Sequence, residues 1–166
     1  MVQLIDGDDI DLKTGRITYA MPLARPYDWT KAGDSRLFGT MVASAGLAEI
    51  KTCADGIGPW KLYIVLVKGR LDAAGRLVDV NGDGKIDLRD ASTQPATTLV
   101  ADAHEAGLFV HTFTFRNEKR RLAFDYRGDP QAEYLQLFRL GVDGVFADFP
   151  DTAGTARAAL LREAKR

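Results

Sequence analysis

Helical spacing and short apolar runs alternate along the second half of the chain. Thr98–Ala106 has its apolar residues on one side, and Gly107 stands where a helix of this kind commonly ends. The run Leu108–Phe115 follows at once, and its β-branched and aromatic residues predict a strand.

The same order of elements then repeats. Asp129 and Pro130 supply an N-cap and a first-turn proline for a helix that reaches Gly141. A strand over Val142–Ala147 and a closing helix over Thr152–Lys165 complete the pattern. Helices that connect successive apolar strands are typical of a parallel sheet, so the fold class is α/β.

The first half is less regular. Val2–Ile5 predicts a strand that ends in a polar loop, and Leu37–Ala54 has the spacing of a helix. Gly56–Pro59 should end that helix and form a loop. The apolar run Leu62–Val67 fits either a strand or a buried extended segment.

Charge and composition exclude several classes of protein. Twenty-two Lys and Arg residues against 23 Asp and Glu residues give a net charge of −1, which offers no footprint for nucleic acid or an anionic membrane. Lys119, Arg120 and Arg121 are interpreted as a solvated helix face. Cys53, the single cysteine, excludes an internal disulfide and is expected to be a buried filler. No apolar stretch approaches the ~20 residues of a membrane span.

A calcium-binding loop is the most specific local motif. Over Asp79–Asp90, oxygen-bearing side chains recur at alternate positions, a glycine stands at the sixth position and an aliphatic residue at the eighth. This spacing lets the oxygens converge on one hard cation. The predicted calcium ligands are Asp79, Asn81, Asp83, the backbone carbonyl of Lys85, Asp87 and Asp90. The loop lies inside a polar insertion over residues 69–94.

The last loop position qualifies this interpretation. Asp90 stands where a glutamate usually closes an EF-hand, and the shorter carboxylate resembles extracellular, dockerin-like loops. We therefore expect a structural calcium site. The alternative is an Asp- and Gly-rich turn that binds nothing. Because the sequence holds no second loop of this kind, a paired EF-hand sensor or a dockerin module is disfavoured.

Several stretches together resemble glycerophosphodiester phosphodiesterases, especially a bacterial, long-loop branch that contains calcium. They are Ala54–Lys61, Gly107–Glu118 and Gly141–Asp151, of which the last is the most specific, and Val2–Ile5 resembles an earlier strand. The resemblance implies a TIM (β/α)8 barrel that hydrolyses glycerophosphodiesters to glycerol 3-phosphate and an alcohol. At ~30 residues per βα unit, 166 residues hold only part of such a barrel. We expect residues 1–166 to be its C-terminal portion, with three or four barrel strands.

The catalytic groups that the resemblance implies are missing. Family members use two histidines, one in a His-Arg pair, and carboxylates that hold a catalytic divalent cation. This chain has only His104 and His111 and no His-Arg pair. We therefore expect a fragment that is inactive alone and name no catalytic residue. The alternative function is a calcium-stabilised binding or interaction module without catalysis.

Substrate-binding candidates lie in and just after the strand Leu108–Phe115. His111 either contacts substrate or is an inward-facing barrel histidine, and period-two spacing places Phe113 and Phe115 on its face. Arg116 either meets a phosphate or pairs with Glu118 or Asp148. The expected partner is a small glycerophosphodiester in the full-length enzyme, and self-association through open barrel edges is a further expectation. The loop type favours a secreted or periplasmic protein.

Overall fold

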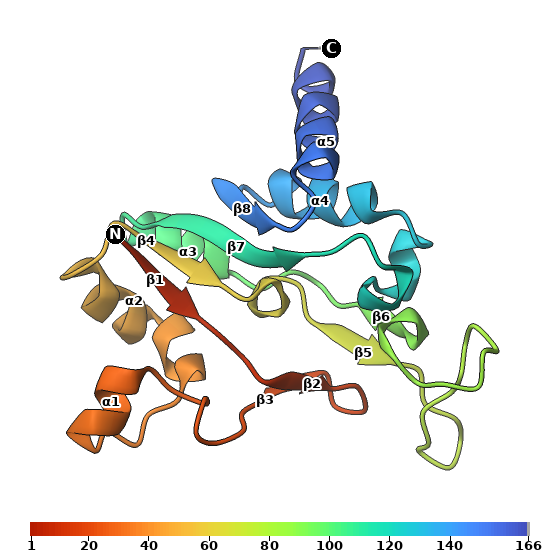
Figure 1. Cartoon of the computed structure of the whole chain (residues 1–166), viewed down its shortest axis with the longest axis horizontal. Helices are drawn as coiled ribbons and strands as arrows, with labels where there is room; N and C mark the ends of the chain where they lie inside the picture. The colour runs from red at the N-terminus through yellow and green to blue at the C-terminus, as the bar shows by residue number, and fades with distance from the viewer. Residues whose placement is uncertain (166) are drawn as a thin grey trace.

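The computed structural model describes residues 1–165, and its centre is a four-stranded parallel sheet. The strand order is β1 (Val2–Ile5), β4 (Gly56–Pro59), β7 (Phe109–Phe115) and β8 (Gly144–Ala147), and every neighbouring pair is parallel (Figure 1). The predicted α/β class and the three strands expected near β1, β7 and β8 are thereby confirmed. Such a sheet is what part of a (β/α)8 barrel provides.

Helices pack on one face of this sheet. They are α2 (Ser44–Lys51), α3 (Leu99–Glu105) and α4 (Pro130–Arg139). The closing helix α5 (Pro150–Glu163) packs mainly against α4 and projects beyond the sheet, while the short α1 (Tyr27–Ala32) lies in the connection after β1. The core between sheet and helices is built from fully buried side chains, among them Ile5, Leu47, Ile57, Val110, Phe115, Tyr134 and Leu137.

Two hairpins extend from the ends of β1 and β4. One pairs β2 (Asp9–Asp11) with β3 (Arg16–Thr18), and the other pairs β5 (Val67–Gly69) with β6 (Ala91–Thr93). The expected calcium loop lies between β5 and β6. The short 3-10 helices are η1 (Phe38–Val42), η2 (Lys61–Tyr63), η3 (Leu88–Asp90), η4 (Lys119–Arg121) and η5 (Phe124–Tyr126).

The expected continuous helix over Leu37–Ala54 is wrong. Ala43 is extended and separates η1 from α2. The chain folds back at this point, so closely that a Cβ on Gly46 would lie 2.4 Å from the carbonyl oxygen of Thr40. Cys53, which follows α2, is exposed and not the buried filler that its neighbours suggested.

The loop assigned to Gly56–Pro59 is also wrong, because this segment is β4 and is fully buried. A Cβ on Gly56 would lie 2.4 Å from the ring of Phe109, and one on Gly58 would lie 2.6 Å from Leu4. Glycine is therefore used for close packing of neighbouring strands. The following run Leu62–Val67 is not one strand. It begins inside η2 and ends at Val67, which is the first residue of β5.

The face of the sheet opposite the helices is open. Val110 and Thr112 of β7 are buried toward the helices, whereas His111 between them lies on the other face, above Gly144. Leu4 and Phe146 share this open face and are 53% and 46% exposed. In a (β/α)8 barrel the helices cover the outside, so the open face corresponds to the barrel interior.

Candidate functional site

A cavity of about 300 Å³ lies at the carboxyl edge of the sheet. Because the strands are parallel, the segments that follow them meet at this edge, which is where α/β folds bind ligands. The loop after β1, the turn after β4 and the end of β7 all contribute to its wall. The lining residues are Gly7, Asp8, Trp60, Lys61, Leu62, Leu88, Thr114, Arg116 and Arg121.

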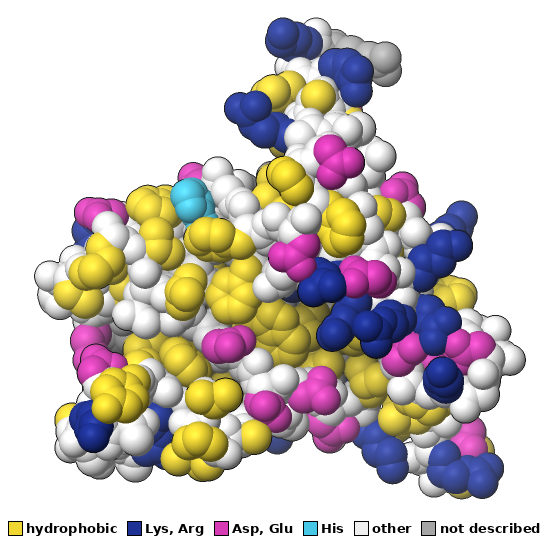
Figure 2. Space-filling view, viewed as in Figure 1, with side chains coloured by type: hydrophobic (Ala, Val, Ile, Leu, Met, Phe, Trp, Pro, Cys, Tyr) yellow, Lys and Arg dark blue, Asp and Glu magenta, His cyan; other side chains and the backbone are white. Residues whose placement is uncertain are grey.

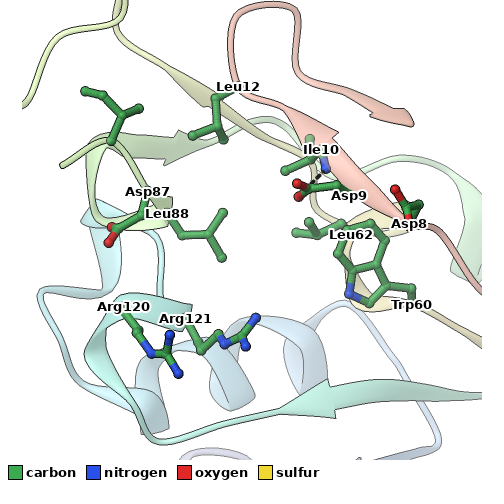
Figure 3. Close-up of a pocket in the computed structure, with 11 residues that line it drawn as sticks. Asp8, Asp9, Ile10, Leu12, Trp60, Leu62, Asp87, Leu88, Arg120 and Arg121 are labelled. Atoms are coloured by element: carbon green, nitrogen blue, oxygen red, sulfur yellow. Dashed lines mark hydrogen bonds between the residues drawn. The ribbon is translucent and has the colours of Figure 1, made fainter. Parts of the chain in front are cut away.

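A second cavity of about 400 Å³ adjoins the first and shares Asp8, Trp60, Leu62, Leu88 and Arg121 with it. It extends toward the predicted calcium loop, which contributes Ile86, Asp87 and Leu88. Figure 3 shows Arg120 and Arg121 of η4 on one side of this cavity, and Asp8, Asp9 and Trp60 on another. The two cavities together form a groove, and we refer to them as the edge cavity and the outer cavity.

Arg116 lies where the sequence predicted, directly after β7, and it pairs with two carboxylates. Its guanidinium lies 2.6 Å from Glu118 and 2.9 Å from Asp148. Hydrogen bonds from Arg116 lower the pKa of Glu118 to about 2. Arg116 is nevertheless 39% exposed at its side chain and lines the edge cavity. Ion pairing thus fixes the direction of a guanidinium that still borders the cavity.

His111 and Phe113 lie on the open face of the sheet. His111 is the third residue of β7, further from the carboxyl edge than the sequence suggested, and its ring lies 4.6 Å from that of Phe109. Phe113 is half-buried, and its backbone forms an isolated parallel β-bridge with that of Trp60. Neither residue lines the edge cavity or the outer cavity.

Phe115 does not share the face of His111, and the period-two expectation fails there. The pairing of β7 with β8 shifts register between Thr112 and Phe115, so that Phe115 turns toward the helices. It is fully buried and stacks on Tyr134 with ring centroids 4.4 Å apart. The structure therefore places Phe115 in the core, away from both cavities.

A buried ion pair beneath the edge cavity was not foreseen from the sequence. The Lys61 ammonium lies 2.6 Å from Glu133 of α4, and the two side chains are 8% and 5% exposed. Burial raises the pKa of Glu133, and the nearby ammonium only partly opposes this. The ammonium also lies 5.4 Å from the centre of the Phe115 ring. The pair joins the end of β4 to α4 and so fixes one wall of the cavity.

The six predicted calcium ligands all belong to the one loop between β5 and β6. Their carboxylates contact backbone N–H groups and an arginine. Asp79 accepts hydrogen bonds from Gly82 and Gly84, and Asp90 accepts from Val80 and Asp87. Arg89 pairs with both Asp83 and Asp87. Within residues 1–165, no three His, Cys, Asp or Glu side chains are gathered closely enough to hold a metal ion.

The donor set still fits calcium in chemistry. Asp79, Asn81, Asp83 and Asp87 supply side-chain oxygens from one short loop, and Gly82 and Gly84 adopt the positive φ angles that its sharp turns need. Asp90 is buried at the end of the loop, where its carboxylate already accepts hydrogen bonds from both arms. Binding would require Arg89 to release the two carboxylates that it now contacts.

The parallel β/α architecture is consistent with part of a (β/α)8 barrel, and two arginines line the cavity at the carboxyl edge of its sheet. Residues 28–152 match the model of the glycerophosphoryl diester phosphodiesterase family, which is most of the chain. The chain belongs to this family. The predicted resemblance is thus confirmed at the level of the family.

Similar proteins from Arabidopsis thaliana agree with this assignment. The chain is 35% identical over 116 residues to glycerophosphodiester phosphodiesterase GDPD6, which covers 69% of the chain and 26% of that protein. It is 37% identical over 125 residues to glycerophosphodiester phosphodiesterase GDPDL1, which covers 74% of the chain and 13% of that protein. A shorter match of 63 residues to GDPDL7 reaches 56% identity and covers 36% of the chain and 8% of that relative. The chain thus spans about a quarter or less of the length of these relatives.

Proposed function

We propose that the chain forms one side of a site that hydrolyses glycerophosphodiesters to glycerol 3-phosphate and an alcohol. The observation that carries this proposal is the edge cavity, which is lined by Arg116 and Arg121 and whose lining residues, except Gly7 and Asp8, lie within the family match. Guanidinium groups are well suited to phosphate oxygens because they donate paired hydrogen bonds. The family match supports the general reaction class.

In this proposal Arg116 meets the phosphate, and its two carboxylate partners hold the guanidinium in direction. His111 and Phe113 lie on the open face of the sheet, next to which the glycerol backbone would pack. Phe115 has no contact with substrate in this proposal and stabilises the core by stacking on Tyr134. His104 is unsuited to binding the substrate, because it lies on α3 and its Nε2 is 2.8 Å from the carboxylate of Asp143.

We further propose that this chain does not hydrolyse substrate by itself. The resemblance implies two catalytic histidines and carboxylates that hold a divalent cation. The two histidines present lie on α3 and in the middle of β7, and neither borders the edge cavity. A complementary half-barrel would supply the remaining groups, and the cation held there would neutralise phosphate charge.

The direct test is an assay of the purified chain with glycerophosphocholine in the presence of calcium or magnesium. We expect no choline release above a buffer control, yet binding of glycerol 3-phosphate that is visible as NMR shift changes. Arg116→Gln should weaken this binding about ten-fold, because a charge-assisted contact is lost. Arg162→Gln on α5 is the matched control and should bind as the parent does. Turnover by the chain alone would contradict the proposed inactivity, and absence of any binding would contradict the phosphate site.

A second candidate function rests on the loop Asp79–Asp90. We propose that it binds one structural calcium ion, which would make the chain a calcium-stabilised binding module whether or not it meets a catalytic partner. The turn geometry and the density of oxygen donors support this.

A calcium site of modest affinity suits the high calcium concentration outside cells, so we also propose a secreted or periplasmic location. We propose in addition that the chain belongs to a calcium-containing bacterial branch of the family. No helix within residues 1–165 is long and apolar enough to cross a membrane.

A further inference from the structure

The groove formed by the edge cavity and the outer cavity has walls of opposite charge. Asp8 and Asp9 come from the loop after β1 and the start of β2, and Arg120 and Arg121 come from η4. Trp60 lies beside the acidic wall and borders both cavities. Figure 2 shows the corresponding face of the molecule, with basic side chains gathered on one side of an apolar hollow and acidic ones on the other.

Within residues 1–165, the charged side chains of these two walls are not held in close ion pairs. Other charged groups around the groove are paired, since Arg116 contacts Glu118 and Asp148, and Asp87 contacts Arg89. In contrast, within the part of the chain that the structure describes, Arg120, Arg121, Asp8 and Asp9 take part in none of the ion pairs within 4.0 Å. A polar groove that keeps both signs of charge available is complementary to a ligand that carries both.

The floor of the outer cavity is apolar. Ile10 and Leu62 are buried members of one hydrophobic cluster, and Leu88 packs against it. A volume of about 400 Å³ lies within the ~300–1,000 Å³ range that is typical of small-molecule sites. The outer cavity therefore has the size and lining of a binding site, although it lies beyond the edge cavity where the proposed reaction takes place.

We propose that the outer cavity binds the alcohol half of the substrate and selects alcohols that carry an ammonium group. This inference rests on the proposed function, which places the phosphate in the edge cavity beside Arg116 and Arg121. A diester held there extends its alcohol past Trp60 into the outer cavity, because Trp60 borders both spaces. Asp8 and Asp9 on the same side attract a cation, and the indole face adds a cation–π contact.

The basic wall completes the selection. Arg121 borders both cavities and faces the phosphate, and Arg120 keeps an ammonium group on the acidic side of the groove by repulsion. An anionic alcohol would meet Asp8 and Asp9, and a neutral one would gain nothing from either wall. A zwitterionic diester is therefore the preferred ligand.

The experiment compares three ligands that share the glycerol phosphate half. Glycerophosphocholine, glycerophosphoglycerol and glycerol 3-phosphate are titrated into the full chain, and dissociation constants are taken from two-dimensional NMR spectra and from tryptophan fluorescence. We expect glycerophosphocholine to bind about five-fold more tightly than glycerophosphoglycerol. The double substitution Asp8→Asn and Asp9→Asn should abolish this difference. It should not weaken the binding of glycerol 3-phosphate, because the Asp8 carboxylate also lines the edge cavity and repels a phosphate there.

Asp28→Asn on the exposed face of α1 is the matched control and should keep the parent's preference. Arg121→Gln should weaken all three ligands, because it contacts the shared phosphate. Equal affinity of the parent chain for the choline and glycerol diesters would overturn the ammonium preference and leave the proposed function standing. Failure to bind glycerol 3-phosphate would instead contradict the proposed function. A preference that survives in the Asp8 and Asp9 variant would also overturn the inference, and that comparison requires only that the variant keeps the parent's NMR spectrum.

Discussion

The buried pair of Lys61 and Glu133 is the least ordinary residue-scale feature of the fold. Burying two charges costs desolvation energy that a single short contact offsets only in part. One carboxylate oxygen of Glu133 is buried without a hydrogen-bond partner among the described residues, so the pair is not fully satisfied. We therefore expect this pair to specify how α4 meets the end of β4 more than to add net stability.

A double-mutant cycle tests this expectation. Lys61→Met or Glu133→Leu alone should lower the free energy of unfolding by about 3–5 kcal/mol, because each leaves one buried charge unpaired. The double substitution should cost far less than the sum of the two, and urea unfolding measures all four states. Glu163→Ala, which breaks the half-exposed pair with Arg139, is the control and should cost under ~1 kcal/mol. Additive losses at Lys61 and Glu133 would contradict the coupling.

Residue-level prediction from sequence succeeded where the determinant was local and failed where it was not. Arg116 was placed correctly after its strand, and both carboxylates considered as partners contact it. Glu133 could not be predicted to pair with Lys61, because their contact depends on how α4 docks against the end of a strand far away in sequence. Phe115 was misplaced because a register shift interrupts the alternation of β7.

At the scale of elements, the strands rich in β-branched and aromatic residues were predictable and β4 was not. Gly56–Pro59 has the composition of a turn, since glycine and proline both disfavour strands. It is nevertheless a strand in the structure. Glycine is needed there because Phe109 and Leu4 occupy the space that side chains would take, and this is a tertiary requirement that composition does not reveal. The limits of α2 were missed for the same kind of reason, a close backbone contact at Gly46.

The loop between β5 and β6 should respond to calcium as an element. Calcium must displace Arg89 from Asp83 and Asp87, and it then draws the oxygens of the loop together. Added calcium should raise the melting temperature by several degrees with one ion bound per chain, and a chelator should reverse this. Calorimetric titration and thermal unfolding measure the two effects.

Three variants sharpen the calcium test. Asp79→Ala should abolish binding, whereas Arg89→Gln should strengthen it by removing the competing cation. Asp72→Ala, in the same insertion but outside the twelve-residue loop, should bind calcium as the parent does. No heat and no change in melting temperature at millimolar calcium would show that the loop is only a polar turn. Weaker binding by Arg89→Gln would contradict the proposed competition.

At the scale of the molecule, residues 1–165 leave one face of the central sheet and two strand edges uncovered. Leu4 and Phe146 are among the most exposed large apolar side chains that belong to strands, and both lie on the open face with His111. The outer strands β1 and β8 also leave free hydrogen-bonding edges, which favour pairing with another chain. A closed barrel would remove both features at once, because it has no edge and fills its interior with side chains.

We therefore expect the chain to self-associate through this face when no complementary half-barrel is present. The mean mass in sedimentation velocity should rise with protein concentration, and the double substitution Leu4→Lys with Phe146→Lys should shift the chain to monomer, because each change places a charge on the surface that would be buried. Leu161→Lys on α5 is the matched control, since Leu161 is 47% exposed but lies away from the sheet. A parent chain that stays monomeric at every concentration would show that the open face is tolerated in water. A control that dissociates equally well would show that the association does not depend on this face.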